Sequence, residues 1–208
     1  MKGRGRDEGN ASHIREAAKQ LFIEKGYDGT TMQAIADASG VNKALLHYYF
    51  ESKDKLFLLI FRHELAELSD SMATLWDGDG KPLGQRFEDW IDALTAFISR
   101  APHLPLFIVA EMTRNPELIK GLLAEFLPPS NILALAEGEP APGGGVTLPA
   151  FVELVGVVYS LIVFPVLAAP MIHHLLGVDS PLLDELMASQ TRLAKEVVHR
   201  RLDGQAPP

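Results

Sequence analysis

The sequence predicts an all-α protein, and three features of the chain favour this class. Apolar residues recur at intervals of three and four along most of its 208 residues, as they do on one face of a helix. No segment alternates apolar and polar residues as a half-buried strand would. Proline and glycine fall between the helical segments, where they end one helix before the next begins.

The N-terminal helices are expected to be short. The first runs from about 12 to 25 and ends at Gly26. The second begins at Thr30, because Thr30 and Gln33 have the spacing of a capping box. Gly40 ends it, since glycine readily adopts the left-handed backbone conformation that closes a helix.

A third short helix and a long fourth helix follow. Asn42 can cap the third helix, and Ser52 can cap the fourth. Because only residues 39–41 separate the second and third helices, the three together predict a helix-turn-helix domain. The apolar stripe of the long fourth helix consists of Leu58, Phe61, Leu65, Leu68, Met72 and Leu75.

Four or more helices are expected beyond residue 80. The first has a clear apolar face, formed by Leu83, Phe87, Trp90, Ile91, Leu94, Phe97 and Ile98. Pro102 and Pro105 bracket a turn, and Asn115-Pro116 starts the next helix, which Pro128-Pro129 interrupts. Residues 137–149 read as a loop. Two C-terminal helices are expected over 149–176 and 180–201.

Composition limits the classes of function. The net charge is −8, and 47% of residues are hydrophobic, as is typical of a globular protein. The absence of cysteine excludes disulfides, thiolate metal sites and a cysteine nucleophile, and is compatible with the cytoplasm. The opening residues MKGRGRDEGN are not followed by an apolar stretch, so they are not a secretory signal.

Charge is distributed unevenly between the two ends of the chain. Residues 1–55 contain nine basic and eight acidic residues, whereas 56–208 contain ten and nineteen, a net charge of −9. Only the N-terminal end is therefore compatible with a polyanion as its partner.

The third helix has the residues that DNA reading requires. In a helix-turn-helix domain this helix enters the major groove, and neighbouring elements contact phosphates. Leu45, Leu46 and Phe50 suit the small core, while Lys43, Ala44 and His47 can reach base edges. Tyr48 can place its hydroxyl on a phosphate, and Lys53 begins a helix whose N–H groups favour an anion.

Residues 13–56, HIREAAKQLFIEKGYDGTTMQAIADASGVNKALLHYYFESKDKL, resemble the DNA-binding domain of the TetR/AcrR transcriptional regulators. The most specific part is GYDGTTMQAIADASGV, followed by the aromatic pair, Phe50 and Ser52-Lys53. The resemblance implies an all-α homodimer that binds an inverted-repeat operator in double-stranded DNA, most often as a repressor, and is released by a small effector. The expected DNA-binding residues are Thr31, Gln33, Asn42, Lys43, Ala44, His47, Tyr48 and Lys53.

The expected organisation has four parts: a disordered basic tail over 1–10, the helix-turn-helix domain over 11–55, a helical effector-binding and dimerisation domain over 56–204, and a disordered tail over 205–208. Aromatic and apolar residues with few charges in the second domain suit an apolar or amphipathic effector. The expected effector-binding residues are Met72, Trp90, Leu94, Phe97, His103, Phe107, Glu111, Phe126 and Tyr159.

Residues 154–178 contain no charged side chain. This uncharged segment is long enough for a membrane span. Pro165, Pro170 and the absence of a second span favour a buried helix or a dimer interface instead. With the final helix it would form a four-helix bundle across the two-fold axis. The expected interface residues are Val158, Leu161, Phe164, Pro165, Leu186, Leu193 and Val197.

No catalytic constellation and no cofactor site is expected. His173-His174 are adjacent and point about 100° apart on a helix, so they cannot share a metal. Gly143 to Gly145 are not followed by the Lys and Ser or Thr of a phosphate-binding loop. The alternative to a regulator is a helical small-molecule carrier or enzyme whose N-terminal helices are only structural, and a membrane-attached regulator is a third reading.

Overall fold

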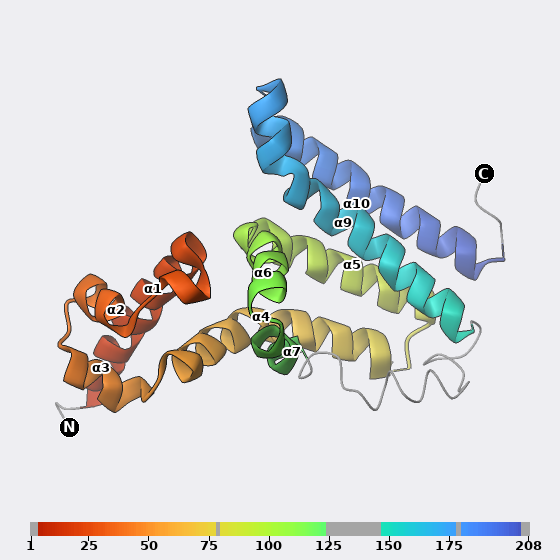
Figure 1. Ribbon diagram of the computed structural model, residues 1–208. Coiled ribbons are helices and arrows are strands. Elements are labelled where there is room, and N and C mark those ends of the chain that lie inside the picture. The colour runs from red at the N-terminus through yellow and green to blue at the C-terminus, as the bar shows by residue number, and fades with distance from the viewer. Residues whose placement is uncertain (1–3, 78–79, 124–146, 178–179, 205–208) are drawn as a thin grey trace. The chain divides into compact units, whose positions relative to one another are not determined.

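The computed structural model describes residues 4–77, 80–123, 147–177 and 180–204, and the regular structure in these ranges is entirely helical (Figure 1). The predicted all-α class is therefore confirmed. The described helices are α1 (Arg4–Gly29), α2 (Met32–Ser39), α3 (Lys43–Phe50), α4 (Lys53–Asp77), α5 (Leu83–Arg100), α6 (His103–Arg114), α7 (Pro116–Leu123), α9 (Leu148–Leu176) and α10 (Ser180–Leu202).

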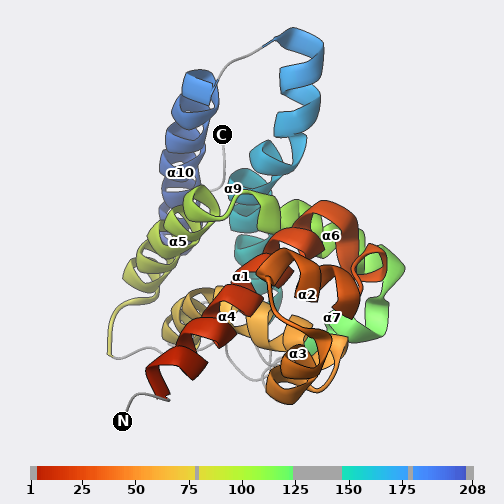
Figure 2. The same cartoon turned by 90° about the vertical axis from the view of Figure 1, so that its left-hand side faces the viewer.

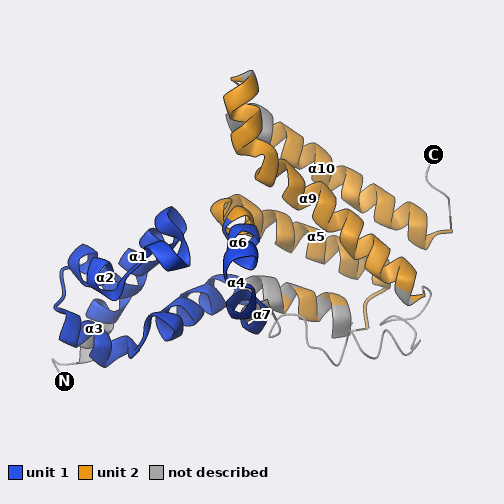
Figure 3. Ribbon diagram, viewed as in Figure 1, with its two compact units in different colours: residues 1–66, 107–122 blue, residues 67–106, 123–208 orange. Residues whose placement is uncertain are grey.

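The chain forms two compact units (Figure 3). Unit 1 consists of residues 1–66 and 107–122, and unit 2 of residues 67–106 and 123–208. Unit 1 therefore extends beyond the expected 11–55 domain, because the first half of α4, most of α6 and nearly all of α7 also belong to it.

Unit 1 is built around aromatic side chains from α1, α4 and α6. The Phe57 ring lies 5.1 Å from Phe22 and 4.5 Å from Phe61, and Phe61 stacks on Phe107 at 4.6 Å between ring centroids. Helices α2 and α3 pack in sequence beside α1, as Figures 1 and 2 show from two sides. This core holds the short α3 in place from one side only.

Helix α1 differs from the expectation at its start. It begins at Arg4 rather than near residue 12, so residues 4–10, expected as part of a disordered tail, are helical. The backbone leaves helical geometry at Gly26 (φ 73°, ψ 175°), where the first helix was expected to end.

Unit 2 contains α5, α9 and α10, which pack against one another. All seven apolar residues predicted for the buried face of α5 are buried. Helix α10 runs antiparallel to α5, as successive contacts show: Thr95 Oγ1 lies 3.2 Å from Thr191 Oγ1, Asp92 lies 2.6 Å from Lys195, and Glu88 lies 2.6 Å from His199.

The remaining helix boundaries lie where proline and glycine predicted them, with one correction. Helix α6 begins at His103, where a turn had been expected up to Pro105, because proline is tolerated in the first turn of a helix. The helices predicted to start at Asn115-Pro116, near Pro149 and at Ser180 are confirmed. Pro128-Pro129 and residues 137–146 lie outside the described residues.

Candidate nucleic-acid interface

Helix α3 presents one face to the core of unit 1 and the other to solvent. Asn42 caps the helix, since its Oδ1 accepts a hydrogen bond of 2.8 Å from the Leu45 N–H. Leu46 is fully buried and Phe50 nearly so, as predicted for the core side. The solvent-facing side consists of Lys43, Ala44, His47 and Tyr48, all exposed, and is called the α3 surface below.

Tyr48 is the most prominent side chain of the α3 surface. It is 80% exposed although it is large and aromatic, and its ring meets that of Tyr49 edge-on at 5.5 Å. Tyr49 is only partly exposed, so it packs against the domain and leaves its neighbour in solvent. An aromatic ring held in solvent with its hydroxyl free to donate suits contact with a phosphate.

Helix α2 starts one residue later than predicted. Thr31 is the N-cap, and its hydroxyl accepts a hydrogen bond of 3.1 Å from the Ala34 N–H. Thr30, predicted to cap, is instead fully buried and donates to the carbonyls of Leu21 and Gly26, because it packs under the broken end of α1. The predicted capping box is therefore wrong, and Gln33 donates to Asp37 at 2.8 Å.

The exposed residues of α2 remain accessible to a ligand. Thr31, at the N-cap, and Gln33, in the first turn, are both exposed, and the helix ends at Gly40, which has the predicted left-handed conformation (φ 69°). Each makes a local hydrogen bond and keeps further capacity for another partner.

Lys53 makes contacts within unit 1 in addition to the predicted DNA contact, which stays a prediction. Its ammonium donates to the carbonyls of Tyr27 (3.0 Å) and Thr30 (3.1 Å), and lies 4.0 Å above the centre of the Tyr27 ring. These carbonyls belong to the broken end of α1 and the turn after it, which lack helical partners. The amine thus donates two hydrogen bonds within the protein, and its third N–H is the one that the predicted contact with a DNA phosphate would use.

Glu111 of α6 reaches the same break in α1. This buried carboxylate accepts hydrogen bonds from the Tyr27 N–H (3.1 Å) and from Asn115 Nδ2 (2.8 Å), and lies 3.8 Å from Arg114. A Cβ atom on Gly26 would lie 2.9 Å from Glu111 Oε1, the oxygen that accepts from the Tyr27 N–H. Glycine therefore suits this position for its small size as well as for its positive φ. Together with Lys53 and Thr30, these residues form what we call the Gly26 junction.

Tyr27 contributes its side chain to this junction as well. Burial, the hydrogen bond from its hydroxyl to Asp54, and the negative charges of Asp54 and Asp28 all raise its pKa well above the ordinary value. The phenol therefore stays neutral and continues to donate across the whole physiological pH range.

Comparison with known proteins locates this geometry in a family. Residues 14–60 match the sequence model described as bacterial regulatory proteins, tetR family. The N-terminal domain belongs to the tetR family. The matched range contains α2, α3 and the first part of α4, so the α3 surface lies within a tetR-type DNA-binding domain.

Two relatives of the tetR-type domain match over the N-terminal segment only. The HTH-type transcriptional repressor AcnR of Corynebacterium efficiens is 32% identical over 60 residues, which are 29% of this chain and 32% of that protein. IcaR of Staphylococcus aureus strain Newman, a negative transcriptional regulator of the biofilm operon icaADBC, is 48% identical over 44 residues, 21% of this chain and 24% of IcaR. The chain thus matches a third or less of the length of these relatives.

Solved structures resemble the chain over nearly its full length. A TetR family transcription regulator from Marinobacter aquaeolei VT8 covers 93% of this chain and 97% of its own, with a TM-score of 0.59 and 20% identity. The hemolysin II transcriptional regulator HlyIIR covers 89% and 98%, with a TM-score of 0.56 and 20% identity. At this identity the likeness concerns the fold.

The predicted effector-binding residues are divided between the two units. Met72, Trp90, Leu94 and Phe97 are buried in unit 2. Phe107 and Glu111 belong to unit 1, where the first stacks on Phe61 and the second binds the Tyr27 N–H, because α6 contributes to both units. Their polar and aromatic groups are thus already engaged, and Phe126 lies outside the described residues.

Trp90 and Tyr159 are brought together in unit 2. Their ring centroids lie 5.4 Å apart, and burial raises the pKa of Tyr159. Trp90 Nε1 is buried and has no hydrogen-bond partner among the described residues. His103, at the start of α6, is partly exposed in the same unit. A buried N–H without a partner is what an acceptor group on a bound molecule would satisfy.

The predicted interface residues fall into two groups. Val158 and Pro165 are buried within the protomer, because they face the helices that pack beside α9, and are not available to a second copy. Phe164 is 65% exposed and Leu193 is 43% exposed, whereas Leu161, Leu186 and Val197 are partly exposed. Other large apolar side chains exposed on α9 are Val152, Met171 and Leu175.

Helix α9 has the length and apolar composition of a membrane span. Only 28% of its most apolar window is buried inside the chain. The helix therefore has a large apolar surface that the described residues do not bury.

Proposed function

We propose that the protein is a transcriptional repressor that binds an operator in double-stranded DNA through the α3 surface. The observation that carries the proposal is an exposed set of a lysine, a histidine and a tyrosine on the third helix of a tetR-type domain. AcnR and IcaR, which match this domain, are named as a repressor and a negative regulator. Repression is the corresponding proposal for this chain.

The α3 surface offers both kinds of contact that sequence-specific binding needs. Lys43 and His47 can donate to base edges in the major groove, and Ala44 can pack against a thymine methyl group. Tyr48 and, from the preceding helix, Thr31 and Gln33 can bind phosphates, which fixes the helix in its groove. The side chain of Asn42 caps α3 by accepting from the Leu45 N–H, and it is exposed next to Lys43 in the sequence.

Selection of bound duplexes from a random DNA pool tests this proposal. We expect enrichment of an inverted repeat, with recognition helices about 34–36 Å apart in successive major grooves. The double variant Lys43→Ala, His47→Ala should select a different or relaxed sequence, whereas the control Lys120→Ala, an exposed lysine of α7, should select the original one. Failure to enrich any sequence, or an unchanged motif in the double variant, would contradict the assignment.

An inverted-repeat operator requires a two-fold partner, and α9 and α10 are the proposed interface. Phe164, Met171, Leu175 and Leu193 are exposed large apolar residues on these helices. A second copy would cover them and bury on the order of 2,000 Å² or more, as obligate interfaces do. The same pairing accounts for the apolar surface of α9 without a membrane.

Light scattering tests the homodimer. Phe164→Asp should convert the protein to a monomer and weaken operator binding, because it would place an unpaired charge in the interface. Thr113→Asp adds the same charge at an exposed position of α6 and should leave the dimer intact. A wild-type protein that is monomeric at micromolar concentration would contradict this part of the proposal.

The proposed effector is a small apolar or amphipathic molecule bound in unit 2, near Trp90 and Tyr159. It would release DNA by binding more tightly to a conformation whose two α3 helices no longer match the operator spacing. A small-molecule screen for DNA release tests this idea, with Trp90→Phe as the variant that removes the unpartnered N–H together with part of the ring. If only highly charged metabolites released DNA, the apolar site would be the wrong one. The proposal also includes that the protein is a soluble, cytoplasmic regulator without catalytic activity.

A further inference from the structure

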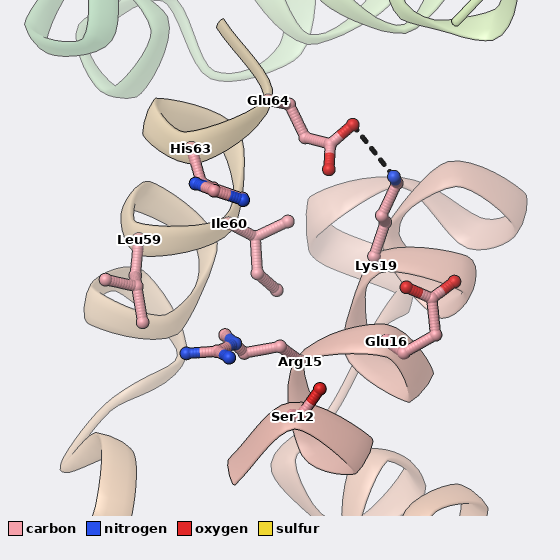
Figure 4. A pocket seen from close by; sticks show the side chains of 8 residues that line it. All are labelled: Ser12, Arg15, Glu16, Lys19, Leu59, Ile60, His63 and Glu64. Atoms are coloured by element: carbon pink, nitrogen blue, oxygen red, sulfur yellow. Dashed lines mark ion pairs between the residues drawn. The ribbon is translucent and has the colours of Figure 1, made fainter. Parts of the chain in front are cut away.

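Unit 1 contains a pocket that is separate from the α3 surface. It lies between α1 and α4 and has a volume of about 340 Å³ (Figure 4). Ligand sites in proteins occupy roughly 300–1,000 Å³, so this pocket is at the small end of that range. Its walls come from Ser12 to Lys19 of α1 and Leu59 to Glu64 of α4, all within unit 1.

The acidic residues of the pocket already have partners. Glu64 forms an ion pair of 2.8 Å with Lys19, and both side chains are about four-fifths buried, at 21% and 20% exposure. Glu16 accepts a hydrogen bond of 3.1 Å from Gln20 on the same helix. Lys19 therefore compensates the charge of Glu64, whereas Glu16 has a neutral partner and keeps its negative charge.

Two of the remaining polar side chains, Arg15 and His63, can donate hydrogen bonds to a ligand. Among the described residues, neither Arg15 nor His63 makes a hydrogen bond or ion pair, and both line the pocket. Figure 4 shows Arg15 extending from α1 toward α4 and His63 projecting from α4 toward α1. A guanidinium is always charged and binds planar carboxylates through two parallel N–H groups.

The wall between these donors is apolar. Ile60 is only 4% exposed and Leu59 is 43% exposed. Donors on two opposing helices, with an apolar side chain between them, match a molecule that has an anionic group and a short hydrocarbon part.

We propose that the α1–α4 pocket binds a small organic acid. Arg15 and His63 hold its carboxylate, and Leu59 and Ile60 contact its apolar part. The site is distinct from the effector region proposed in unit 2, and the inference does not depend on DNA binding by α3.

Benzoate is a suitable probe, because it combines one carboxylate with one ring. Benzamide has nearly the same shape without the charge, and benzylamine carries the opposite charge. Titration into the full-length protein, at constant ionic strength, is followed by the NMR signal of the His63 ring, identified by its loss in His63→Gln. We expect saturable binding of benzoate with a Kd on the order of 1–10 mM, typical of a ligand of this size.

Arg15→Gln should weaken benzoate binding about tenfold or more, because it removes a charge-assisted contact and keeps most of the stem. Arg15→Lys should keep part of the affinity. Arg192→Gln, at an exposed arginine of α10, controls for the change in net charge and should bind benzoate as the wild type does. Since Arg15 is exposed, all three variants should fold, which circular dichroism verifies.

Three results would overturn the proposal. These are no saturation at roughly ten times the expected Kd, equal affinity for benzamide or benzylamine, or unchanged benzoate binding by Arg15→Gln. If Arg15→Gln instead weakened binding to every duplex while benzoate failed to bind, the arginine would be a phosphate contact, and the proposal would be equally wrong.

Discussion

The α3 surface and the Gly26 junction lie in the same unit, and their polar side chains behave in opposite ways. At the junction, Thr30, Lys53 and Glu111 all bond to backbone groups at the broken end of α1. On the α3 surface, Lys43 and Tyr48 are exposed. A polar residue near a helix-turn-helix motif can therefore serve the fold or the ligand, and its partners distinguish the two cases.

This difference has an energetic consequence. Breaking a junction contact leaves a buried donor or acceptor unsatisfied and should lower the free energy of unfolding. Substituting an exposed side chain should leave the free energy of unfolding nearly unchanged and alter only what the surface binds. The following predictions test this separation, in order of decreasing effect on stability.

The largest effect is expected for Gly26→Ala. The backbone at Gly26 has a positive φ, and the new Cβ would lie 2.9 Å from Glu111 Oε1, so strain and a clash combine. We expect the free energy of unfolding to fall by about 3 kcal/mol, measured by urea denaturation. Gly9→Ala is the control, because this helical glycine has no atom near its Cβ position and should be neutral or stabilising.

Glu111→Leu should be the next most destabilising substitution. It removes the acceptor of the Tyr27 N–H while filling a similar volume, which should cost about 2 kcal/mol. Glu117→Leu on α7 replaces an exposed glutamate and should change stability much less. Equal effects of the two substitutions would show that the junction contact contributes nothing specific.

Lys53→Met should cost about 1–2 kcal/mol, since two carbonyls lose a charged donor. If the amine is committed to the fold, the slope of log K for DNA against log salt should stay unchanged in the folded variant. If instead the amine contacts a phosphate, the slope should fall by about 0.9. Lys55→Met, at an exposed surface pair, is the control.

Sequence patterns predicted the helices of the fold well, because helix signals are local. Apolar spacing predicted the buried face of α5, and Gly40, Asn42 and Ser52 mark helix ends where expected. The predicted start of α1 was wrong by about eight residues and the predicted cap of α2 by one residue. In the second case either threonine is a suitable N-cap residue and only Thr30 has a glutamine three positions later, but the burial of Thr30 against α1 makes Thr31 the cap.

The site was predictable only in part, for the same reason. Helical periodicity places Lys43 and His47, four residues apart, on the same side of α3, and that side is exposed. The roles of Lys53 and Glu111 depend on contacts between segments 26 and 84 residues apart in sequence. No local pattern predicts such contacts. The glycine at position 26 indicated only the break in α1 beside which Glu111 binds the Tyr27 N–H.

Tyr48→Ala should have the smallest effect on stability and a clear effect on binding. The side chain is 80% exposed, so the free energy of unfolding should change by less than about 0.5 kcal/mol. Operator affinity should fall about tenfold, because a contact to a charged phosphate is lost. Tyr48→Phe separates the two parts of the side chain, since it keeps the ring beside Tyr49 and removes only the hydroxyl. Phe retaining full affinity would assign the contact to the ring, whereas an unchanged Kd in Tyr48→Ala would remove this residue from the interface.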